Sequence, residues 1–283
     1  MKLVSFLAEG LASYGILEGT QILDIGKVLH QQFPDLKAML GHGSLAVADE
    51  ARANASKLNL AQVELLPPIP NPAKIFCIGH NYEEHRLETG RAKTTFPAVF
   101  LRFADTLVAH GQSPWIPRDS AEIDFEGEMA VVIGRGGRYI SRQHALEHVA
   151  GYSCFNDISV RDWQRHTSQF APGKNFPRTG GFGPWIVTSD EIPNPQELEL
   201  TTRLNGEVVQ HASTAQMIFP VDELIEYLSS FTPLSAGDVI VSGTPGGVGV
   251  KRTPQLFMKA GDLVEIEIAS IGTLRNTMTP ESR

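Results

Sequence analysis

The proline-rich stretch PPIPNP at positions 67–72 constrains the folding of this chain more than any other feature. Proline lacks a backbone N–H and restricts the residue before it, so neither a helix nor a central strand is expected to run through this stretch. The chain of 283 residues is therefore expected to divide into a small N-terminal domain, residues 1–68, and a larger domain, residues 69–283.

Residues 1–68 are expected to form a small α/β domain. Three short β-like runs, LVSFLA, ASYGIL and QILDIG, are separated by the turn signals Glu9-Gly10 and Glu18-Gly19, which predicts a small meander. The segment AVADEARANASKL at 46–58 is rich in Ala, Glu, Arg and Lys, which favour helix, and predicts one.

The larger part is expected to be a β-rich α+β domain. Its strand-like runs, such as EMAVVIG, PWIVT and DLVEIEIAS, recur among many Gly and Pro residues without a helix between each pair. This arrangement argues against a regular doubly wound parallel sheet. Asn205-Gly206, flanked by alternating residues in RLNGEVVQ, predicts a β-hairpin.

The charge of the chain limits its partners. Its 32 acidic residues outnumber its 24 basic ones, the net charge is −8, and the basic residues form no long block. Small molecules, rather than nucleic acid or an anionic membrane, are therefore the expected partners. No apolar run approaches the roughly 18–20 residues of a spanning helix, and MKLVSFLAEG lacks a signal-peptide core, so a cytoplasmic location is expected.

The stretch IDFEGEMAVVIG (123–134) places two carboxylates in a segment that otherwise resembles a buried strand. Residues two apart on a strand project from the same face, so Glu126 and Glu128 are expected to lie side by side. Their repulsion is relieved by solvent, by protonation or by a cation. An exposed strand edge and a metal site are both compatible with this spacing.

A third carboxylate follows an apolar strand in VAGYSCFNDISVRDWQ (149–164). Asp157 either lies near a helix start or joins Glu126 and Glu128. Three carboxylates suit a hard cation such as Mg²⁺ or Mn²⁺, with Ca²⁺ as a substitute, better than zinc. A structural Ca²⁺ in a non-catalytic binding protein is one alternative. A second is zinc at HALEH (144–148), which fits the short pattern H-x-x-E-H.

The segment KIFCIGHNYEEHRLETG (74–90) predicts a strand, a turn with Asn81 as N-cap, and a short helix that stops at Gly90. His85 and Glu88 are three residues apart and share a helix face. A carboxylate beside an imidazole stabilises its protonated form, as a water-activating base requires. An exposed helical ion pair has the same spacing.

Lys174 in APGKNFP and the glycine-rich loop SGTPGGVG (242–249) are candidate substrate contacts. Glycines let backbone N–H groups approach an anion closely. The loop is not a P-loop, because no Gly-Lys-Ser/Thr follows it, and GRGGRY lacks the last glycine of the dinucleotide fingerprint.

In their order and spacing, these segments resemble the fumarylacetoacetate hydrolase family over roughly residues 70–280. The matching segments are KIFCIGHNYEEH, DFEGEMAVVIG, GYSCFNDISVRDWQ, the Gly-Lys of APGKNFP, GPWIVT, LNGEVVQ with MIF, and VSGTPGGVG. The resemblance implies a mixed β-roll or sandwich catalytic domain, a small N-terminal domain and a homodimer. The chain departs from many relatives at Pro177-Arg178, where an Asp is frequent, and at Arg102, where Lys is common.

The resemblance also implies roles for individual residues. Glu126, Glu128 and Asp157 are expected to hold a divalent ion, usually Mg²⁺. His85 with Glu88 is expected to activate water on a segment that can close over the substrate. The implied substrate contacts are Arg161, Gln164, Lys174, Gly243 and Thr244.

The expected activity is metal-assisted hydrolysis of a C–C bond in an acylpyruvate-like or fumarylacetoacetate-like 1,3-diketo acid, a reaction of aromatic catabolism. Lys174 and the ion would stabilise the enolate that leaves. Oxaloacetate decarboxylation, and keto–enol or double-bond isomerisation of hydroxymuconate-like acids, need the same site and remain alternatives.

Overall fold

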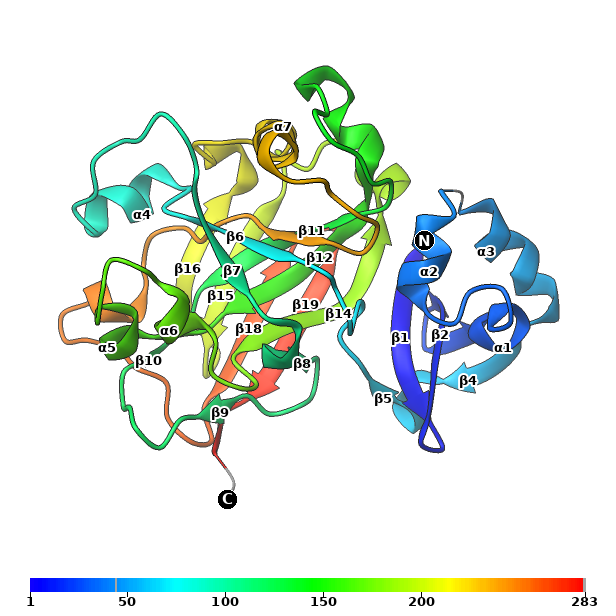
Figure 1. Ribbon diagram of the computed structural model, residues 1–283. Helices are drawn as coiled ribbons and strands as arrows, with labels where there is room; N and C mark the ends of the chain where they lie inside the picture. Colours follow the sequence, from blue (N-terminus) through cyan, green and yellow to red (C-terminus); the bar gives the residue numbers. More distant parts are fainter. Residues whose placement is uncertain (44, 282–283) are drawn as a thin grey trace.

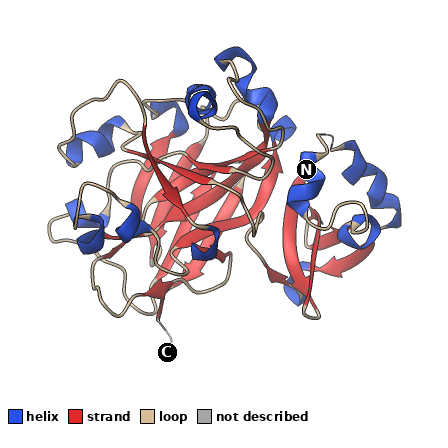
Figure 2. Ribbon diagram, in the orientation of Figure 1, coloured by secondary structure: helices blue, strands red, loops and turns tan. Residues whose placement is uncertain are grey.

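The computed structural model describes residues 1–43 and 45–281, so positions 282 and 283, the end of the predicted larger domain, lie outside the described residues. A 12-stranded mixed sheet runs through both halves of the chain, and a four-stranded antiparallel sheet packs against it (Figure 1; Figure 2). This β-rich α+β architecture confirms the predicted fold class.

The large sheet follows the path β4-β3-β2-β1-β14-β12-β11-β17-β6-β7, with β5 beside β1 and β8 beside β14. Its first five strands in the chain are β1 (Lys2–Ala8), β2 (Leu11–Glu18), β3 (Gln21–Asp24), β4 (Ser56–Asn59) and β5 (Glu64–Leu65). The others are β6 (Ile75–Gly79), β7 (Ala98–Arg102), β8 (Leu107–Ala109), β11 (Gly127–Ile133), β12 (Val149–Asp157), β14 (Gly180–Thr188) and β17 (Val239–Val241).

The smaller sheet and two short ribbons complete the β structure. The smaller sheet has the order β16-β15-β18-β19. Its strands are β15 (Glu199–Leu204), β16 (Glu207–Ser213), β18 (Leu263–Ile268) and β19 (Gly272–Thr277). The ribbons pair β10 (Ile123–Asp124) with β13 (Ser159–Val160) and β9 (Trp115–Ile116) with β20 (Thr279–Pro280).

Helices are short and lie around the sheets (Figure 2). The α-helices are α1 (Gly26–Leu29), α2 (Leu36–Gly41), α3 (Ala46–Ala51), α4 (Glu83–Glu88), α5 (Arg161–Gln164), α6 (Ala171–Lys174) and α7 (Val221–Phe231). The 3₁₀ turns are η1 (Arg52–Asn54), η2 (Leu60–Gln62), η3 (Ala104–Thr106), η4 (Arg142–His148), η5 (Ser189–Glu191), η6 (Thr214–Gln216) and η7 (Gly249–Lys251).

Strand β11 lies in the middle of the molecule. It is hydrogen-bonded to β12 on one side and β17 on the other, and all seven of its residues are buried. Met129 and Val131 pack toward the smaller sheet in one hydrophobic cluster, while Ala130 and Val132 belong to a second cluster. The acidic stretch before and within β11 is therefore not an exposed strand edge.

The local turn predictions are confirmed, whereas one helix prediction is wrong. Glu9-Gly10 and Asn205-Gly206 both have positive φ and join β1 to β2 and β15 to β16. The helix predicted over 46–58 ends as α-helix at Ala51, and Ser56–Asn59 forms β4 instead. Pairing of β4 with β3 overrides the helix propensity of this segment.

The N-terminal strands extend the sheet of the larger part. β1 pairs with β14, with Lys2 opposite Val187 and Leu3 opposite Ile186. Residues 67–72 form neither helix nor strand, as the prolines predict. The division into two domains at residue 68 stays a prediction, since one sheet continues across it.

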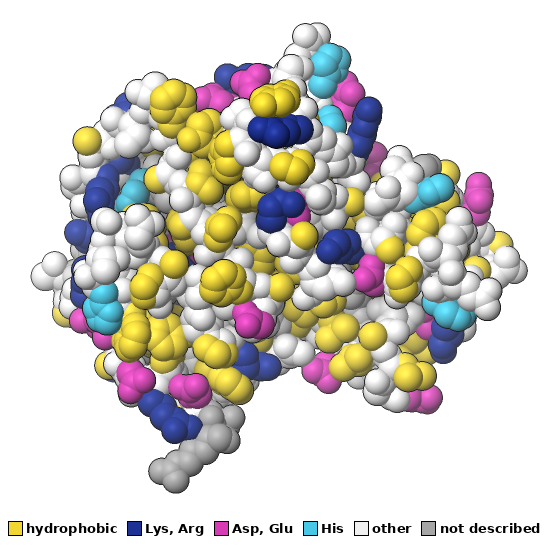
Figure 3. Space-filling model, in the orientation of Figure 1, with side chains coloured by type: hydrophobic (Ala, Val, Ile, Leu, Met, Phe, Trp, Pro, Cys, Tyr) yellow, Lys and Arg dark blue, Asp and Glu magenta, His cyan; other side chains and the backbone are white. Residues whose placement is uncertain are grey.

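No helix in residues 1–43 and 45–281 combines the length and hydropathy that crossing a bilayer requires. On the face drawn in Figure 3, acidic and basic side chains are interspersed without one dominant basic patch.

Candidate active site

Three carboxylates converge where β11 begins and β12 ends. Glu126 and Glu128 flank the first residue of β11, and Asp157 is the last residue of β12, its antiparallel neighbour. One oxygen of each lies within 4.8 Å of the others, and all three residues are buried. A Cβ at Gly127 would lie 2.1 Å from Thr202 Oγ1, so the position between the glutamates requires glycine. The structure thus brings together the three predicted metal ligands.

Buried basic side chains surround two of these carboxylates. Lys174 Nζ, at the end of α6, donates to Glu126 Oε2 (2.6 Å) and Asp157 Oδ2 (2.5 Å). Arg102 Nε donates to Asp157, and Arg161 Nη2 forms an ion pair of 2.7 Å with Glu126. Burial opposes a charged lysine, but the charges of Asp157 and Glu126 outweigh it and hold the pKa of Lys174 above its usual value.

Glu128 is the carboxylate that these bases leave uncompensated. It accepts a hydrogen bond from the Gly243 N–H and forms no ion pair with any described residue. Burial, reinforced by the charges of Asp157 and Glu126, raises the pKa of Glu128 well above its usual value. A divalent cation would relieve this repulsion, and a set of three carboxylates suits a hard cation. The chemistry of the site therefore fits a divalent metal held by these three residues.

His85 and Glu88 lie on α4 and are in contact. His85 Nδ1 lies 2.6 Å from Glu88 Oε1, and His85 is 4% exposed, so the pair is not an exposed helical ion pair. The other oxygen of Glu88 accepts a hydrogen bond from the Gly247 N–H (3.0 Å), which ties α4 to the glycine-rich loop. A Cβ at Gly247 would lie 2.5 Å from Val209 O, so the loop requires glycine here.

The prediction that Asn81 caps α4 is wrong, because the N-cap is Tyr82. The buried Asn81 amide instead donates to the carbonyl oxygens of Phe219 (3.0 Å) and Ser242 (2.7 Å). It also accepts a hydrogen bond from the Phe219 N–H (2.8 Å). These bonds fix the turn between β6 and α4, and hence the start of the helix that carries His85.

The glycine-rich loop reaches the carboxylates through protein contacts. The Thr244 hydroxyl donates to Gly127 O (3.0 Å) and accepts from Gln210 Nε2 (2.8 Å). Gln210 Oε1 also accepts from the Gly127 N–H (3.0 Å). Gly243, with φ of 103°, donates its N–H to Glu128. The predicted substrate contacts of Gly243 and Thr244 stay predictions.

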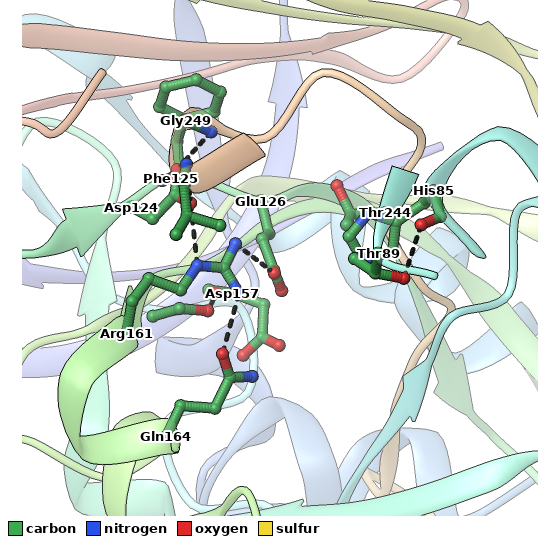
Figure 4. A network of polar contacts seen from close by, with 12 residues as sticks. His85, Thr89, Asp124, Phe125, Glu126, Asp157, Arg161, Gln164, Thr244 and Gly249 are labelled. Atoms are coloured by element: carbon green, nitrogen blue, oxygen red, sulfur yellow. Dashed lines mark hydrogen bonds and ion pairs between the residues drawn. The ribbon is translucent and has the colours of Figure 1, made fainter. Parts of the chain in front are cut away.

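Arg161 reaches from α5 toward Asp124 and Glu126, with Gln164 beside it (Figure 4). It donates from Nε to Asp124 Oδ2 (2.8 Å) and from Nη1 to Gln164 Oε1 (3.0 Å). Asp124 also accepts a hydrogen bond from the Gly249 N–H (2.8 Å), so it joins Arg161 to the glycine-rich loop. The sequence analysis missed Asp124, although DFEGE places it two positions before Glu126.

The side chains of the site surround one cavity of about 470 Å³. Of the predicted site residues, those that line it are Glu126, Glu128, Asp157, His85, Lys174, Arg161, Gln164 and Thr244. Glu88 and Gly243 do not line the cavity, but each contacts a residue that does.

The two histidines of HALEH do not converge on a common metal position. His144 Nδ1 lies 2.8 Å from the exposed Glu147, and His148 Nδ1 lies 2.8 Å from Arg135 O. In the part of the chain that the structure describes, three metal-ligating side chains converge only at the carboxylates of β11 and β12. The zinc alternative therefore has no support in the structure.

Comparison with known proteins agrees with this architecture. The chain matches the family model "Fumarylacetoacetate (FAA) hydrolase C-terminal" over residues 74–279. It is 39% identical over 287 residues to the mitochondrial oxaloacetate tautomerase fahd2 of Xenopus laevis, covering 98% of this chain and 89% of that protein.

Two solved structures have the same fold. Fumarylacetoacetate hydrolase (EaFAH) from the psychrophilic Exiguobacterium antarcticum has a TM-score of 0.87 and 33% identity, covering 99% of this chain and 100% of that one. Maleylpyruvate hydrolase from Sphingobium sp. SYK-6, solved with manganese (II) ion and pyruvate, has a TM-score of 0.84 and 26% identity, covering 100% of both chains.

The β-rich α+β fold is that of known enzymes, and its buried carboxylate trio is suited to a divalent cation. This chain belongs to the fumarylacetoacetate hydrolase family. The family is shared by hydrolases and tautomerases, so membership alone does not select the reaction. The homodimer and the cytoplasmic location stay predictions, and the Xenopus relative is named mitochondrial.

Proposed function

We propose that this chain interconverts the keto and enol forms of oxaloacetate, or of a similar 2-keto dicarboxylate, with a divalent cation such as Mg²⁺ or Mn²⁺. The observation that carries the proposal is the carboxylate trio lining the same cavity as His85, which is paired with Glu88. The name of the Xenopus relative, which is similar over 98% of this chain, favours tautomerisation over the C–C hydrolysis expected first from the sequence.

The reaction moves one proton. The C3–H bond of the keto acid breaks, its electron pair forms the C2=C3 double bond, and the C2 oxygen takes up a proton. His85 would receive the C3 proton at Nε2, because its Nδ1 faces Glu88, whose charge stabilises the imidazolium. Lys174 and Arg161 also line the cavity and would keep positive charge near the oxygen on which negative charge develops. When bound, the cation would polarise the C2 carbonyl as a Lewis acid.

Basic side chains on the cavity favour a dicarboxylate substrate. Arg91 and Lys251 are exposed and line the cavity, and neither forms an ion pair within the described residues. Arg165, which also lines it, is already paired with Glu122 (2.5 Å). Two free positive charges beside a chelated keto acid would attract a second carboxylate. An acid with a carboxylate at each end, such as oxaloacetate, would place its keto-acid end at the carboxylate trio and its second carboxylate near Arg91 and Lys251.

Hydrolysis of an acylpyruvate is the second candidate. Glu88 contacts both His85 and the glycine-rich loop. A histidine paired with a carboxylate in this way can act as the general base that activates water. The structural relative named maleylpyruvate hydrolase supports this reaction class for the same fold. Hydrolysis would place the chain in aromatic catabolism, and it needs a water molecule beside His85 that tautomerisation does not need.

The experiment compares substrates on protein freed of metal with a chelator. Oxaloacetate, acetylpyruvate and diketo sugar acids are each assayed with and without Mg²⁺ or Mn²⁺. We expect metal-dependent decay of the oxaloacetate enol absorbance, above the rate of metal alone and without CO₂ release. Cleavage of acetylpyruvate with no effect on the oxaloacetate enol would overturn the proposal in favour of hydrolysis, and CO₂ release would indicate decarboxylation instead.

Substitution of His85 tests its role in moving the proton. His85→Ala should lower turnover by about 10²–10⁴-fold, the usual contribution of a general base, while calorimetry shows unchanged Mg²⁺ affinity. His144→Ala removes an exposed histidine paired with Glu147 and serves as the control with normal turnover. Normal turnover of His85→Ala would show that another group moves the proton.

A further inference from the structure

His80 is a second imidazole in the cavity, and the reaction described above gives it no role. It has a left-handed backbone conformation, with φ of 56°, which is uncommon for a residue other than glycine. Its ring stacks on His85 at a centroid distance of 5.3 Å and meets Phe170 edge-on at 6.0 Å. Both imidazoles line the same cavity.

The hydrogen bonds around His80 favour one tautomer of its ring. The Thr89 hydroxyl donates its single proton to the carbonyl oxygens of His85 (2.8 Å) and Arg86 (3.1 Å). Thr89 Oγ1 lies 3.4 Å from His80 Nδ1, and because its proton is engaged with these carbonyls, the contact favours Thr89 as the acceptor and Nδ1 as the protonated nitrogen. Nε2 keeps its lone pair.

Nε2 of His80 is buried and finds no hydrogen-bond partner within residues 1–43 and 45–281. A buried acceptor without a donor costs free energy, and a bound ligand that brings a donor recovers it. Burial, followed by the charge of His85, lowers the pKa of His80 to about 4, so the ring is neutral near pH 7. A neutral acceptor pairs with an O–H group rather than with a carboxylate.

The two forms of a 2-keto dicarboxylate differ in this respect. The keto form carries only acceptor oxygens, whereas the enol form carries a hydroxyl donor on C2. We propose that His80 Nε2 accepts a hydrogen bond from this C2 hydroxyl and so makes the cavity selective for 2-hydroxy-2-enedioic acids over their keto forms. The inference rests on the proposed function, because that function supplies the enol.

Two variants distinguish the role of His80 Nε2 as a hydrogen-bond acceptor from any effect of His80 on folding. His80→Asn keeps a residue that tolerates positive φ and can still donate to Thr89 Oγ1, but it removes Nε2. His80→Gln extends an amide toward the position of Nε2 and can restore an acceptor. His144→Asn changes an exposed histidine and is the control. Thermal melting establishes that each variant is folded.

Malate and oxalate are the probes, measured by calorimetry with Mn²⁺ present. Malate has a C2 hydroxyl and two carboxylates, whereas oxalate has no hydroxyl. We expect His80→Asn to weaken malate binding about tenfold, the worth of one hydrogen bond, and to leave oxalate binding unchanged. His80→Gln should recover most of the malate affinity, and ketonisation of enol-oxaloacetate should slow in His80→Asn.

Three results would overturn the role of His80: no malate binding by the unmodified protein, unchanged malate affinity in His80→Asn, or equal weakening of malate and oxalate. Failure of the proposed function is distinguishable from these. It would appear as no effect of the unmodified protein on the oxaloacetate enol, while the difference between malate and oxalate binding can still be measured.

Discussion

Burial, together with the charges of the neighbouring Asp157 and Glu126, raises the pKa of Glu128. Glu128→Gln keeps the shape of the side chain and removes its charge. We expect the free energy of unfolding of the metal-free protein at neutral pH to rise by on the order of 1–3 kcal/mol. Mg²⁺ affinity should fall by at least about 10–100-fold, the cost of losing even an outer-shell partner. Denaturant unfolding and calorimetry measure the two effects.

The same residue gives the stability a pH dependence of known sign. A raised pKa means that folded Glu128 retains a proton that the unfolded chain loses near pH 4.5. Its contribution to stability is therefore full below pH 4.5 and is lost as pH rises through the raised pKa. Glu128→Gln should remove this loss from the metal-free protein. The control is Glu147→Gln at an exposed position, and equal pH profiles for Glu128→Gln and the unmodified protein would contradict the prediction.

Site residues are predictable from sequence where spacing alone groups them. Glu126 and Glu128 are two positions apart on one strand, and Asp124 continues the same alternation, so the pattern could have revealed it too. Arg102 and Gln210 have no such local signal. Arg102 contacts Asp157 across 55 positions and Gln210 contacts Gly127 across 83, so only the fold brings these pairs together.

At the scale of elements, the turn between β6 and α4 positions His85, and Asn81 holds this turn. Asn81→Ala would leave the N–H and carbonyl of Phe219 and the carbonyl of Ser242 without their side-chain partner. We expect a loss of about 2–4 kcal/mol in the free energy of unfolding. Turnover should fall at temperatures where the variant is still folded, because α4 is less well placed. Urea unfolding and steady-state kinetics test this.

The exposed Asn71 offers a matched control, since its amide donates to Asp35 at the surface. Asn71→Ala should change stability by less than about 0.5 kcal/mol. If Asn81→Ala is as stable and as active as Asn71→Ala, the turn is held by other contacts.

Elements were predictable where the local backbone determines them. Asn205-Gly206 adopts positive φ at both residues, which the amino acids themselves favour, and the hairpin forms as expected. The segment 46–58 illustrates the opposite case. Its residues favour helix, but Ser56–Asn59 pairs with β3. Leu58 packs against the hydrophobic cluster formed by the N-terminal strands. Strand pairing with a distant partner is not encoded in a local window.

At the scale of the whole molecule, one hydrophobic core crosses the proline-rich stretch. Leu3 and Met39 from the N-terminal part belong to the same cluster as Val132 and Val241 from the larger part. The predicted site residues all lie beyond residue 72, so the N-terminal part supports their sheet without contributing any of them. The prolines mark a break in secondary structure, which sequence reveals, but the shared core depends on long-range packing.

Removal of residues 1–68 tests whether the larger part is an independent domain. β14 would lose its partner β1, leaving backbone groups unpaired at Ile186 and Val187, and the core around Val132 and Val241 would become exposed to water. We expect the fragment 69–283 to melt at least about 10 °C lower than the full chain, or to aggregate, in thermal scans and size-exclusion chromatography. Adding residues 1–68 as a separate chain should restore part of the loss, because the missing strand and core residues return. A monodisperse fragment that melts within a few degrees of the full chain would contradict this prediction. It would show that the larger part folds alone and that pairing of β1 with β14 adds little to its stability.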